Sequence, residues 1–195
     1  MDKTPFSWYT VRWKYVYPKG ALAMTYLILS DSHGRSDRIE EAVRRVRPDG
    51  ILFAGDGLRD LAHVDPPCPV WAVSGNCDWL TTPLVLRDAL FEPRDEELIV
   101  LEGIRILLIH GHRYGVKGGL GAAVARAVQR DADLLVYGHT HVPVELCIRP
   151  DDSRADFSVT KPLTVLNPGS LGDRDASFGT LTVRGGQILT GHGNL

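Results

Sequence analysis

The chain has 195 residues, of which 44% are hydrophobic and 24% are charged, a balance typical of one globular domain with a sizeable core. Its formal net charge of -2 supplies no overall attraction for nucleic acid or anionic lipid, so an anionic ligand must be held by local charge. The three cysteines are odd in number and lack zinc-type spacing, which indicates a reducing compartment and predicts a cytoplasmic protein. No apolar stretch is long enough to predict a membrane-spanning helix.

Residues 1–23 differ from the rest of the chain, because they are rich in aromatic side chains but contain no apolar run. They do not form a secretory signal, since the hydrophobic centre and the small-residue cleavage site are missing. We interpret them as a dispensable extension, with an arm that docks on a partner as the alternative. The sequence therefore predicts a single domain over residues 24–195.

The first half of the chain alternates predicted strands with predicted helices. An apolar run at 25–29 is followed by residues 36–47, whose apolar side chains recur at helical spacing, and by a second apolar run at 51–54. Because the crossover of such a unit is right-handed, the two strands are expected to lie parallel in one sheet. A third strand is predicted at 70–73, whereas residues 81–97 show only a weak pattern.

The second half begins with a hairpin, because Glu102 and Gly103 separate two apolar runs. A second amphipathic helix is predicted at 120–128, before a strand at 134–137. Beyond His141, short apolar runs between turn residues predict a largely antiparallel second sheet. This order favours an α/β fold with two face-to-face mixed β-sheets flanked by helices, a four-layer αββα sandwich.

Side chains that can bind a metal follow five of the apolar runs. One Asp-x-His pair carries little information, but the repetition at five strand ends does. In open α/β sheets, ligands bind in the crevice beyond the carboxyl ends of the strands, where these side chains are expected to converge. The candidate ligands are Asp31, His33, Asp56, Asn76, His110, His139 and His141.

These candidates are too many for one ion, because a four-coordinate zinc site uses at most four ligands, whereas two ions that share a carboxylate would use them all. Carboxylate, amide and imidazole ligands without thiolate suit manganese, iron, zinc, cobalt or nickel better than magnesium or calcium. Two such ions activate a bridging hydroxide and hold the oxygens of a phosphoryl group during in-line attack. The predicted reaction is phosphate ester hydrolysis.

The order of the motifs resembles that of the calcineurin-like metallophosphoesterase family. The resemblance covers roughly residues 24–183, and residues 167–170 are similar to the family's small stand-alone prokaryotic phosphodiesterases. The motifs that carry it are Asp31-x-His33, Gly55-Asp56, Gly75-Asn76-Cys77-Asp78, His110-Gly111-His112 and Gly138-His139-Thr140-His141.

The resemblance also implies how the ligands are divided between two divalent ions. The residues that match the ligands of one ion are Asp31, His33, Asp56 and His141, and those that match the ligands of the other are Asp56, Asn76, His110 and His139. Asp56 would therefore bridge the ions. We expect manganese in both positions, with nickel, zinc, iron or cobalt as alternatives.

Two departures from the family concern catalysis. Cys77 stands where many members have a histidine that is thought to protonate the leaving group, and we interpret Cys77 as a packing residue because a thiol pKa near 8.5 suits that role badly. The second motif differs from that of protein phosphatases, which disfavours that activity.

His112 either assists the site or caps a turn, and Asp78 either orients a neighbouring group or caps a turn. The predicted catalytic residues are Asp56, Asn76, His110 and His112.

Substrate contacts are predicted from side chains near the motifs. Asn76 is one candidate, and Arg113, Lys117 and Arg174 lie in glycine-bearing loops from which they could hold a substrate phosphate. A solvated surface position explains each of the three cations equally well.

We predict a phosphodiesterase that acts on a small-molecule phosphate ester, with a phosphomonoesterase or a nucleotide pyrophosphatase as alternatives. An alternative function outside catalysis is a protein-interaction scaffold, because one eukaryotic branch of the same fold serves that role. Scaffolds tend to lose ligands, whereas every ligand position is filled here. A nucleic-acid partner is disfavoured because the chain has no basic stripe. A homo-oligomer is compatible with the sequence.

Overall fold

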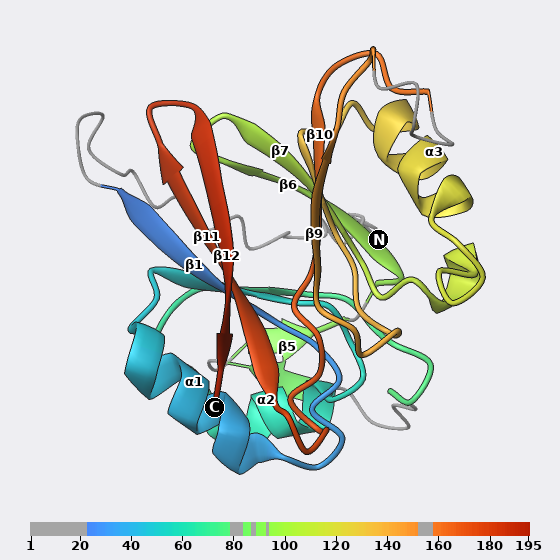
Figure 1. Cartoon of the computed structure of the whole chain (residues 1–195). Helices are drawn as coiled ribbons and strands as arrows, with labels where there is room; N and C mark the ends of the chain where they lie inside the picture. The colour runs from blue at the N-terminus through green and yellow to red at the C-terminus, as the bar shows by residue number, and fades with distance from the viewer. Residues whose placement is uncertain (1–22, 79–83, 87–88, 93, 152–157) are drawn as a thin grey trace, which may run out of the picture.

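The computed structural model describes residues 23–78, 84–86, 89–92, 94–151 and 158–195. Two five-stranded sheets lie face to face, with helices on their outer faces (Figure 1). All but the last residue of the predicted extension, residues 1–23, lies outside the described part of the chain, so its dispensability stays a prediction.

The first sheet has the strand order β12-β11-β1-β2-β3. Strands β1, β2 and β3 run parallel, as the crossover argument predicts, and β11 and β12 continue the sheet in antiparallel fashion on the other side of β1. The bounds are Met24–Leu29 for β1, Gly50–Phe53 for β2, Val70–Ala72 for β3, Ser177–Arg184 for β11 and Gln187–Asn194 for β12.

The second sheet has the strand order β6-β7-β8-β10-β9. Its β6–β7 hairpin turns at Glu102 and Gly103, which both have positive φ, at 50° and 85°, as a tight hairpin requires. A separate hairpin is formed by β4 (Leu84–Leu86) and β5 (Ala89–Phe91). The bounds in the second sheet are Glu96–Leu101 for β6, Ile104–Ile109 for β7, Leu134–Val136 for β8, Val144–Ile148 for β9 and Leu163–Asn167 for β10.

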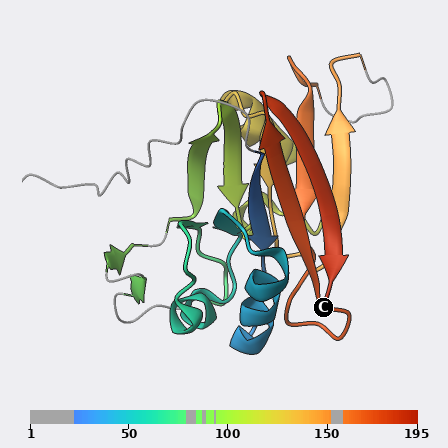
Figure 2. The ribbon, with the colours of Figure 1, turned by 90° about the vertical axis from the view of Figure 1, so that its left-hand side faces the viewer.

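Helices complete the four predicted layers. Helices α1 (Ser36–Val46) and α2 (Leu58–Val64) cover the outer face of the first sheet, and α3 (Gly121–Gln129) covers the outer face of the second (Figures 1 and 2). A short 3-10 helix, η1 (His112–Tyr114), follows β7. In the described part of the chain, each helix is too short or too polar to cross a lipid bilayer.

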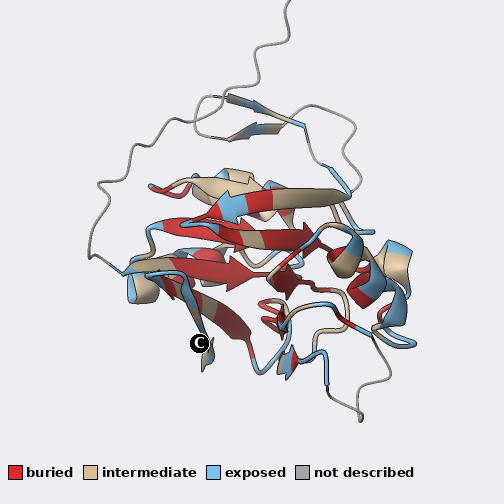
Figure 3. Ribbon diagram, turned by 90° about the horizontal axis from the view of Figure 1, so that it is seen from above, coloured by how far each residue is buried: buried red, intermediate tan, exposed pale blue. Residues whose placement is uncertain are grey.

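The alternation of side chains along β1 shows how the layers are held together. Tyr26 and Ile28 face the second sheet, whereas Leu27 and Leu29 face α1 and α2, as expected for the two-residue period of a strand. All four side chains are fully buried, and Figure 3 shows that the central strands are the most buried part of the fold. The carboxyl ends of β1, β2 and β8 are therefore rigid points from which loops can position a site.

Two sequence-based expectations were incomplete. The strands beyond His141 do not form a sheet of their own, because β9 and β10 complete the second sheet while β11 and β12 extend the first. Short antiparallel runs look alike in sequence, and only burial against a neighbour decides which sheet they join. The pattern also failed to predict α2, whose seven residues are too few to show helical periodicity clearly.

Candidate metal centre

An unusual backbone conformation marks the loops that carry the predicted ligands. Five of the predicted ligands have a positive φ angle, although non-glycine residues rarely adopt one. Such strained residues persist where the surrounding structure holds them, and they cluster at functional sites. The values are 54° at Asp31, 44° at His33, 57° at Asp56, 68° at His139 and 62° at His141.

The first group of ligands comes from the loops after β1 and β8. The Nε2 atom of His141 lies 3.3 Å from Oδ1 of Asp31 and 3.3 Å from Nε2 of His33, which itself lies 3.8 Å from that Oδ1. Asp31 is fully buried, and its Oδ2 accepts hydrogen bonds from the Ser30 hydroxyl and the His139 amide. Its Oδ1 accepts no hydrogen bond from the described residues. A buried carboxylate oxygen facing two imidazole nitrogens fits a bound cation, which would supply the missing partner.

The second group surrounds His110, a fully buried residue at the end of β7. Its Nε2 lies 3.3 Å from Oδ2 of Asp56 and 3.2 Å from Oδ1 of Asn76, and its ring centroid lies 5.0 Å from that of His139. Its Nδ1 lies 2.7 Å from the carbonyl oxygen of Ala54, to which it must donate. The lone pair is therefore on Nε2, on the side of the other ligands.

Asp56 links the two groups. Its ligand atom lies within 4.8 Å of those of His110 and His139, and also within 4.8 Å of those of His33 and Cys77. Its Oδ1 accepts a hydrogen bond of 2.7 Å from the Cys77 amide, which fixes the carboxylate orientation. The residue predicted to bridge two ions thus lies between the two groups.

The protonation states of Asp56 and His139 suit metal binding. Burial opposes ionisation of Asp56, but the neighbouring His110 side chain and a hydrogen bond from the Cys77 amide outweigh that effect and hold the pKa of Asp56 well below its ordinary value. Burial, together with the neighbouring His110, lowers the pKa of His139 to about 4, so this imidazole is neutral near pH 7. Burial raises the pKa of Asp31, an effect that a bound cation would offset.

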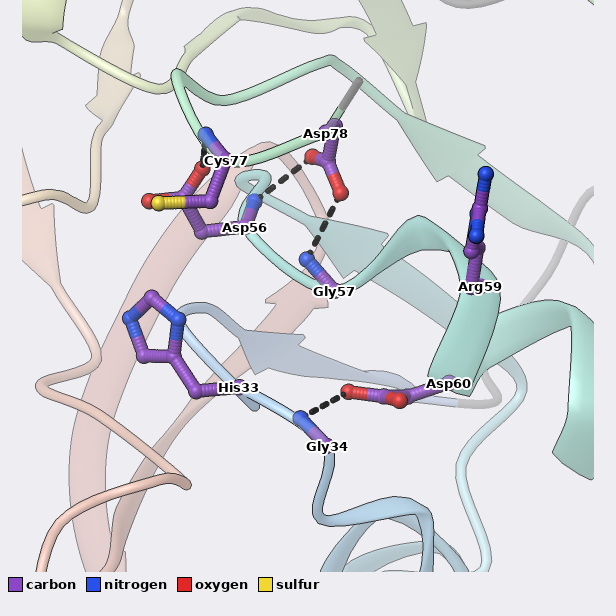
Figure 4. A pocket seen from close by; sticks show the side chains of 8 residues that line it. All are labelled: His33, Gly34, Asp56, Gly57, Arg59, Asp60, Cys77 and Asp78. Carbon is purple, nitrogen blue, oxygen red and sulfur yellow. Dashed lines mark hydrogen bonds between the residues drawn. The ribbon is translucent and has the colours of Figure 1, made fainter. Parts of the chain in front are cut away.

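Three aspartates outside the ligand set hold the ligand loops in place. Asp78 accepts hydrogen bonds from the amides of Asp56 and Gly57 at 2.7 and 2.9 Å (Figure 4), and from the amides of Leu58 and Gly75 at 2.9 and 2.8 Å. Of the two roles considered for Asp78, this geometry supports orienting its neighbours.

The other two aspartates act on the first group of ligands. Asp60 accepts hydrogen bonds from the Ser32 hydroxyl at 2.6 Å and the Gly34 amide at 2.8 Å, one on each side of His33. Asp173 lies 3.0 Å from Nδ1 of His141. Sequence reasoning missed both residues, because each contacts a segment distant in the chain and no spacing pattern signals such a contact.

His112 lies beside two histidines of the second group, and Cys77 lies beside Asp56. The ring of His112 is centred 5.3 Å from that of His110 and 6.2 Å from that of His139, and its buried Nδ1 has no hydrogen-bond partner among the described residues. The packing interpretation of Cys77 was wrong, because its side chain is exposed. Partial desolvation and the nearby Asp56 raise the pKa of the Cys77 thiol, which makes it a weaker proton donor.

A cavity of about 330 Å³ opens beside the linking carboxylate (Figure 4). Of the cations predicted to hold a substrate phosphate, Arg113 pairs with Asp95 at 3.2 Å, and none of Arg113, Lys117 and Arg174 is among the described residues that line the cavity. The cation that does line it, Arg59, was not singled out in the sequence. The lining residues are His33, Gly34, Asp56, Gly57, Arg59, Asp60, Cys77 and Asp78.

Comparison with known proteins relates the chain to metallophosphoesterases by sequence and to a known fold by structure. YsnB of Bacillus subtilis, a probable metallophosphoesterase, is 29% identical over 151 residues, which cover 76% of this chain and 75% of YsnB. The phosphodiesterase YfcE of Escherichia coli is 31% identical over 147 residues, which cover 74% of this chain and 68% of YfcE. Vacuolar Protein Sorting 29 from Cryptosporidium parvum has the same fold, with a TM-score of 0.63 over 90% of this chain and 99% of that chain, at 16% identity.

The model of the calcineurin-like phosphoesterase superfamily domain matches residues 24–186, which include both groups of ligands. Members of this family bind divalent metals, and the two clusters of aspartate and histidine in this structure offer suitable ligands. The chain belongs to the calcineurin-like phosphoesterase superfamily and is a phosphoester hydrolase.

Proposed function

We propose that this protein is a metal-dependent phosphodiesterase with a dinuclear centre. The first ion would be held by Asp31, His33, Asp56 and His141, and the second by Asp56, Asn76, His110 and His139. The observation that carries the proposal is the position of Asp56, which offers a ligand atom within 4.8 Å of those of His33 in the first group and within 4.8 Å of those of His110 and His139 in the second. When bound, two divalent ions lower the pKa of a water nucleophile and neutralise charge on the phosphoryl oxygens.

The chain's own residues would orient the ester and stabilise its departure. Asn76, beside His110, can donate from its amide nitrogen to a phosphoryl oxygen while its Oδ1 faces the second ion position. Burial, with His110 nearby, lowers the pKa of His112, so this imidazole is neutral near pH 7 and serves as a hydrogen-bond donor rather than a general acid. The leaving oxygen would then depart without a strong proton donor among these side chains.

The charge around the cavity favours diesters over monoesters. Besides Asp56, whose charge the two proposed ions would neutralise, the carboxylates of Asp60 and Asp78 line the cavity together with one guanidinium, that of Arg59. A phosphate monoester carries about two negative charges at neutral pH, whereas a diester carries one and meets less repulsion. The cavity also offers about 330 Å³ for a second ester substituent. Relatedness to YfcE, which is named a phosphodiesterase, supports the same substrate class.

The ion we propose first is manganese, because the ligand set mixes carboxylate, amide and imidazole groups. Purified protein stripped of metal and reloaded separately with manganese, nickel, zinc or cobalt is expected to take up two ions per chain. It should then hydrolyse bis-p-nitrophenyl phosphate faster than p-nitrophenyl phosphate or a dinucleoside pyrophosphate. Faster hydrolysis of the monoester would refute the substrate class, and two bound ions without turnover of any ester would favour the scaffold reading.

A further inference from the structure

The loop between β10 and β11 lies against the first group of ligands, although the division of ligands between two ions assigns it no role. Three hydrogen bonds tie it to the end of β1. The Leu171 amide donates to the Ser30 carbonyl at 3.1 Å, and both the Gly172 amide and the Ser170 hydroxyl donate to the Asp31 carbonyl, at 2.8 and 3.0 Å. The loop is therefore fixed relative to the ligand Asp31.

The backbone of Asp173 is anchored in the same way. The guanidinium of Arg38, on α1, donates to the carbonyl oxygens of Leu171 and Asp173. The Ser170 hydroxyl oxygen accepts hydrogen bonds from the Gly172 amide at 3.1 Å and the Asp173 amide at 3.3 Å. Although the Asp173 side chain is half exposed, it starts from a defined backbone position.

The carboxylate of Asp173 is directed at the imidazole of His141. Its two oxygens lie 3.0 and 3.2 Å from Nδ1 of His141, so the proton of the neutral ring sits on Nδ1. The lone pair then lies on Nε2, which is 3.3 Å from the unpartnered Oδ1 of Asp31. In the second group, Nδ1 of His110 faces the carbonyl of Ala54 instead. A carboxylate partner fixes the ring and makes it a stronger ligand than a neutral acceptor does.

We infer that Asp173 is a positioning residue for the first ion: it holds His141 in the ligating tautomer and orientation, and so sets the affinity of that position. The inference rests on the two-ion site proposed above. Loss of such a partner typically weakens metal binding by roughly 10–100-fold.

The test measures metal affinity at each position separately. Manganese binding would be measured by calorimetry and chelator competition, at one fixed pH, in a His139→Ala background that retains the first position and in a His33→Ala background that retains the second. Asp173→Ala is expected to weaken binding by roughly 10–100-fold in the first background and to leave the second unchanged. Asp173→Asn should weaken it less, because the amide oxygen still accepts from Nδ1.

Asp175→Asn is the matched control, since Asp175 is an exposed aspartate of the same loop. It is expected to bind manganese like the parent protein. The melting temperature of the metal-free proteins should change by no more than about 2–4 °C, because an exposed side-chain contact of this kind contributes at most about 1 kcal/mol to stability. Equal affinity of the Asp173→Ala and parent proteins in the His139→Ala background would overturn the inference, and so would equal weakening in both backgrounds. A wild-type chain that takes up fewer than two ions would instead overturn the dinuclear proposal and, with it, the inference.

Discussion

The two groups of ligands are built in different ways. In the second group the side chain of His110 is fully buried, and its Nδ1 is held by a backbone carbonyl of the first sheet. In the first group the side chains of His33 and His141 are 34% and 31% exposed, and aspartates outside the ligand set hold the ring or the loop. His110 thus depends on the packed sandwich, whereas His33 and His141 depend on side-chain contacts between loops. Substitutions should therefore affect the two groups differently, except at Asp56, which we propose that they share.

The shared residue should give the largest effect. Asp56→Asn removes a charge from both ion positions, so hydrolysis is expected to fall by several orders of magnitude while the fold is kept. The check is steady-state kinetics together with metal content and circular dichroism. Near wild-type turnover in a folded Asp56→Asn protein with two bound ions would refute the proposal that Asp56 bridges the two ions.

Asp78 and Asp60 each hold the loops of predicted ligands by accepting hydrogen bonds, so substitutions of the two can be compared. Asp78 accepts four backbone amides that hold Asp56 and the loop before Asn76, whereas Asp60 accepts one amide and one hydroxyl around His33. Because charge-assisted hydrogen bonds contribute about 1.5–3 kcal/mol each and are not additive, Asp78→Ala should cost about 3 kcal/mol of unfolding free energy.

Asp60→Ala should cost about half as much and chiefly weaken metal binding at the first position. Urea unfolding of the metal-free proteins measures both stabilities. An Asp60→Ala protein less stable than the Asp78→Ala protein would contradict the expectation that the four hydrogen bonds to Asp78 stabilise the fold more than the two to Asp60.

Acid should weaken a contact that supports the second group from outside. Glu96 on β6 accepts hydrogen bonds from Tyr114 at 2.6 Å and Arg126 at 2.8 Å, which ties η1 and α3 to the second sheet. The guanidinium of Arg126, against a smaller effect of burial, lowers the pKa of Glu96 from 4.5 to about 2. Because the folded-state pKa is depressed, this stabilisation is present above the unfolded pKa and is lost as the pH falls from about 4.5 towards 2.

Glu96→Gln should therefore reduce the unfolding free energy by about 1–2 kcal/mol at pH 7, a figure that allows for partial solvent exposure. The difference from wild type should shrink by pH 3. Urea titrations at the two pH values check this, with Glu102→Gln as the matched control because Glu102 is an exposed turn residue. A difference that grows in acid would contradict the assigned pKa direction.

The smallest effect is expected from shortening the chain. Neither group of ligands draws on residues 1–23, so a protein that starts at Met24 should keep its melting temperature and its diesterase rate. Calorimetry and the diester assay measure both. A large drop in melting temperature would show instead that the aromatic segment packs on the domain.

Much of the site could be predicted from the sequence, because residues that can bind a metal come directly after predicted strands. Strand-helix-strand units make such strands parallel, so their carboxyl ends meet at one edge of the sheet. The parallel pairing of β1 with β2 and the hairpin at Glu102 and Gly103 depend on local rules and were predicted correctly. Long-range contacts, such as that between Asp173 and His141, leave no periodic signal. The cytoplasmic location, the manganese preference and the substrate roles of Arg113, Lys117 and Arg174 stay predictions.

We propose that Asp56 joins two ion positions into one centre. Electron paramagnetic resonance of the manganese-loaded protein can detect this, because two ions that share a carboxylate are magnetically coupled. We expect a coupled signal in the wild-type protein and its loss in Asp56→Asn. A wild-type spectrum of isolated, uncoupled manganese ions at full occupancy would contradict it.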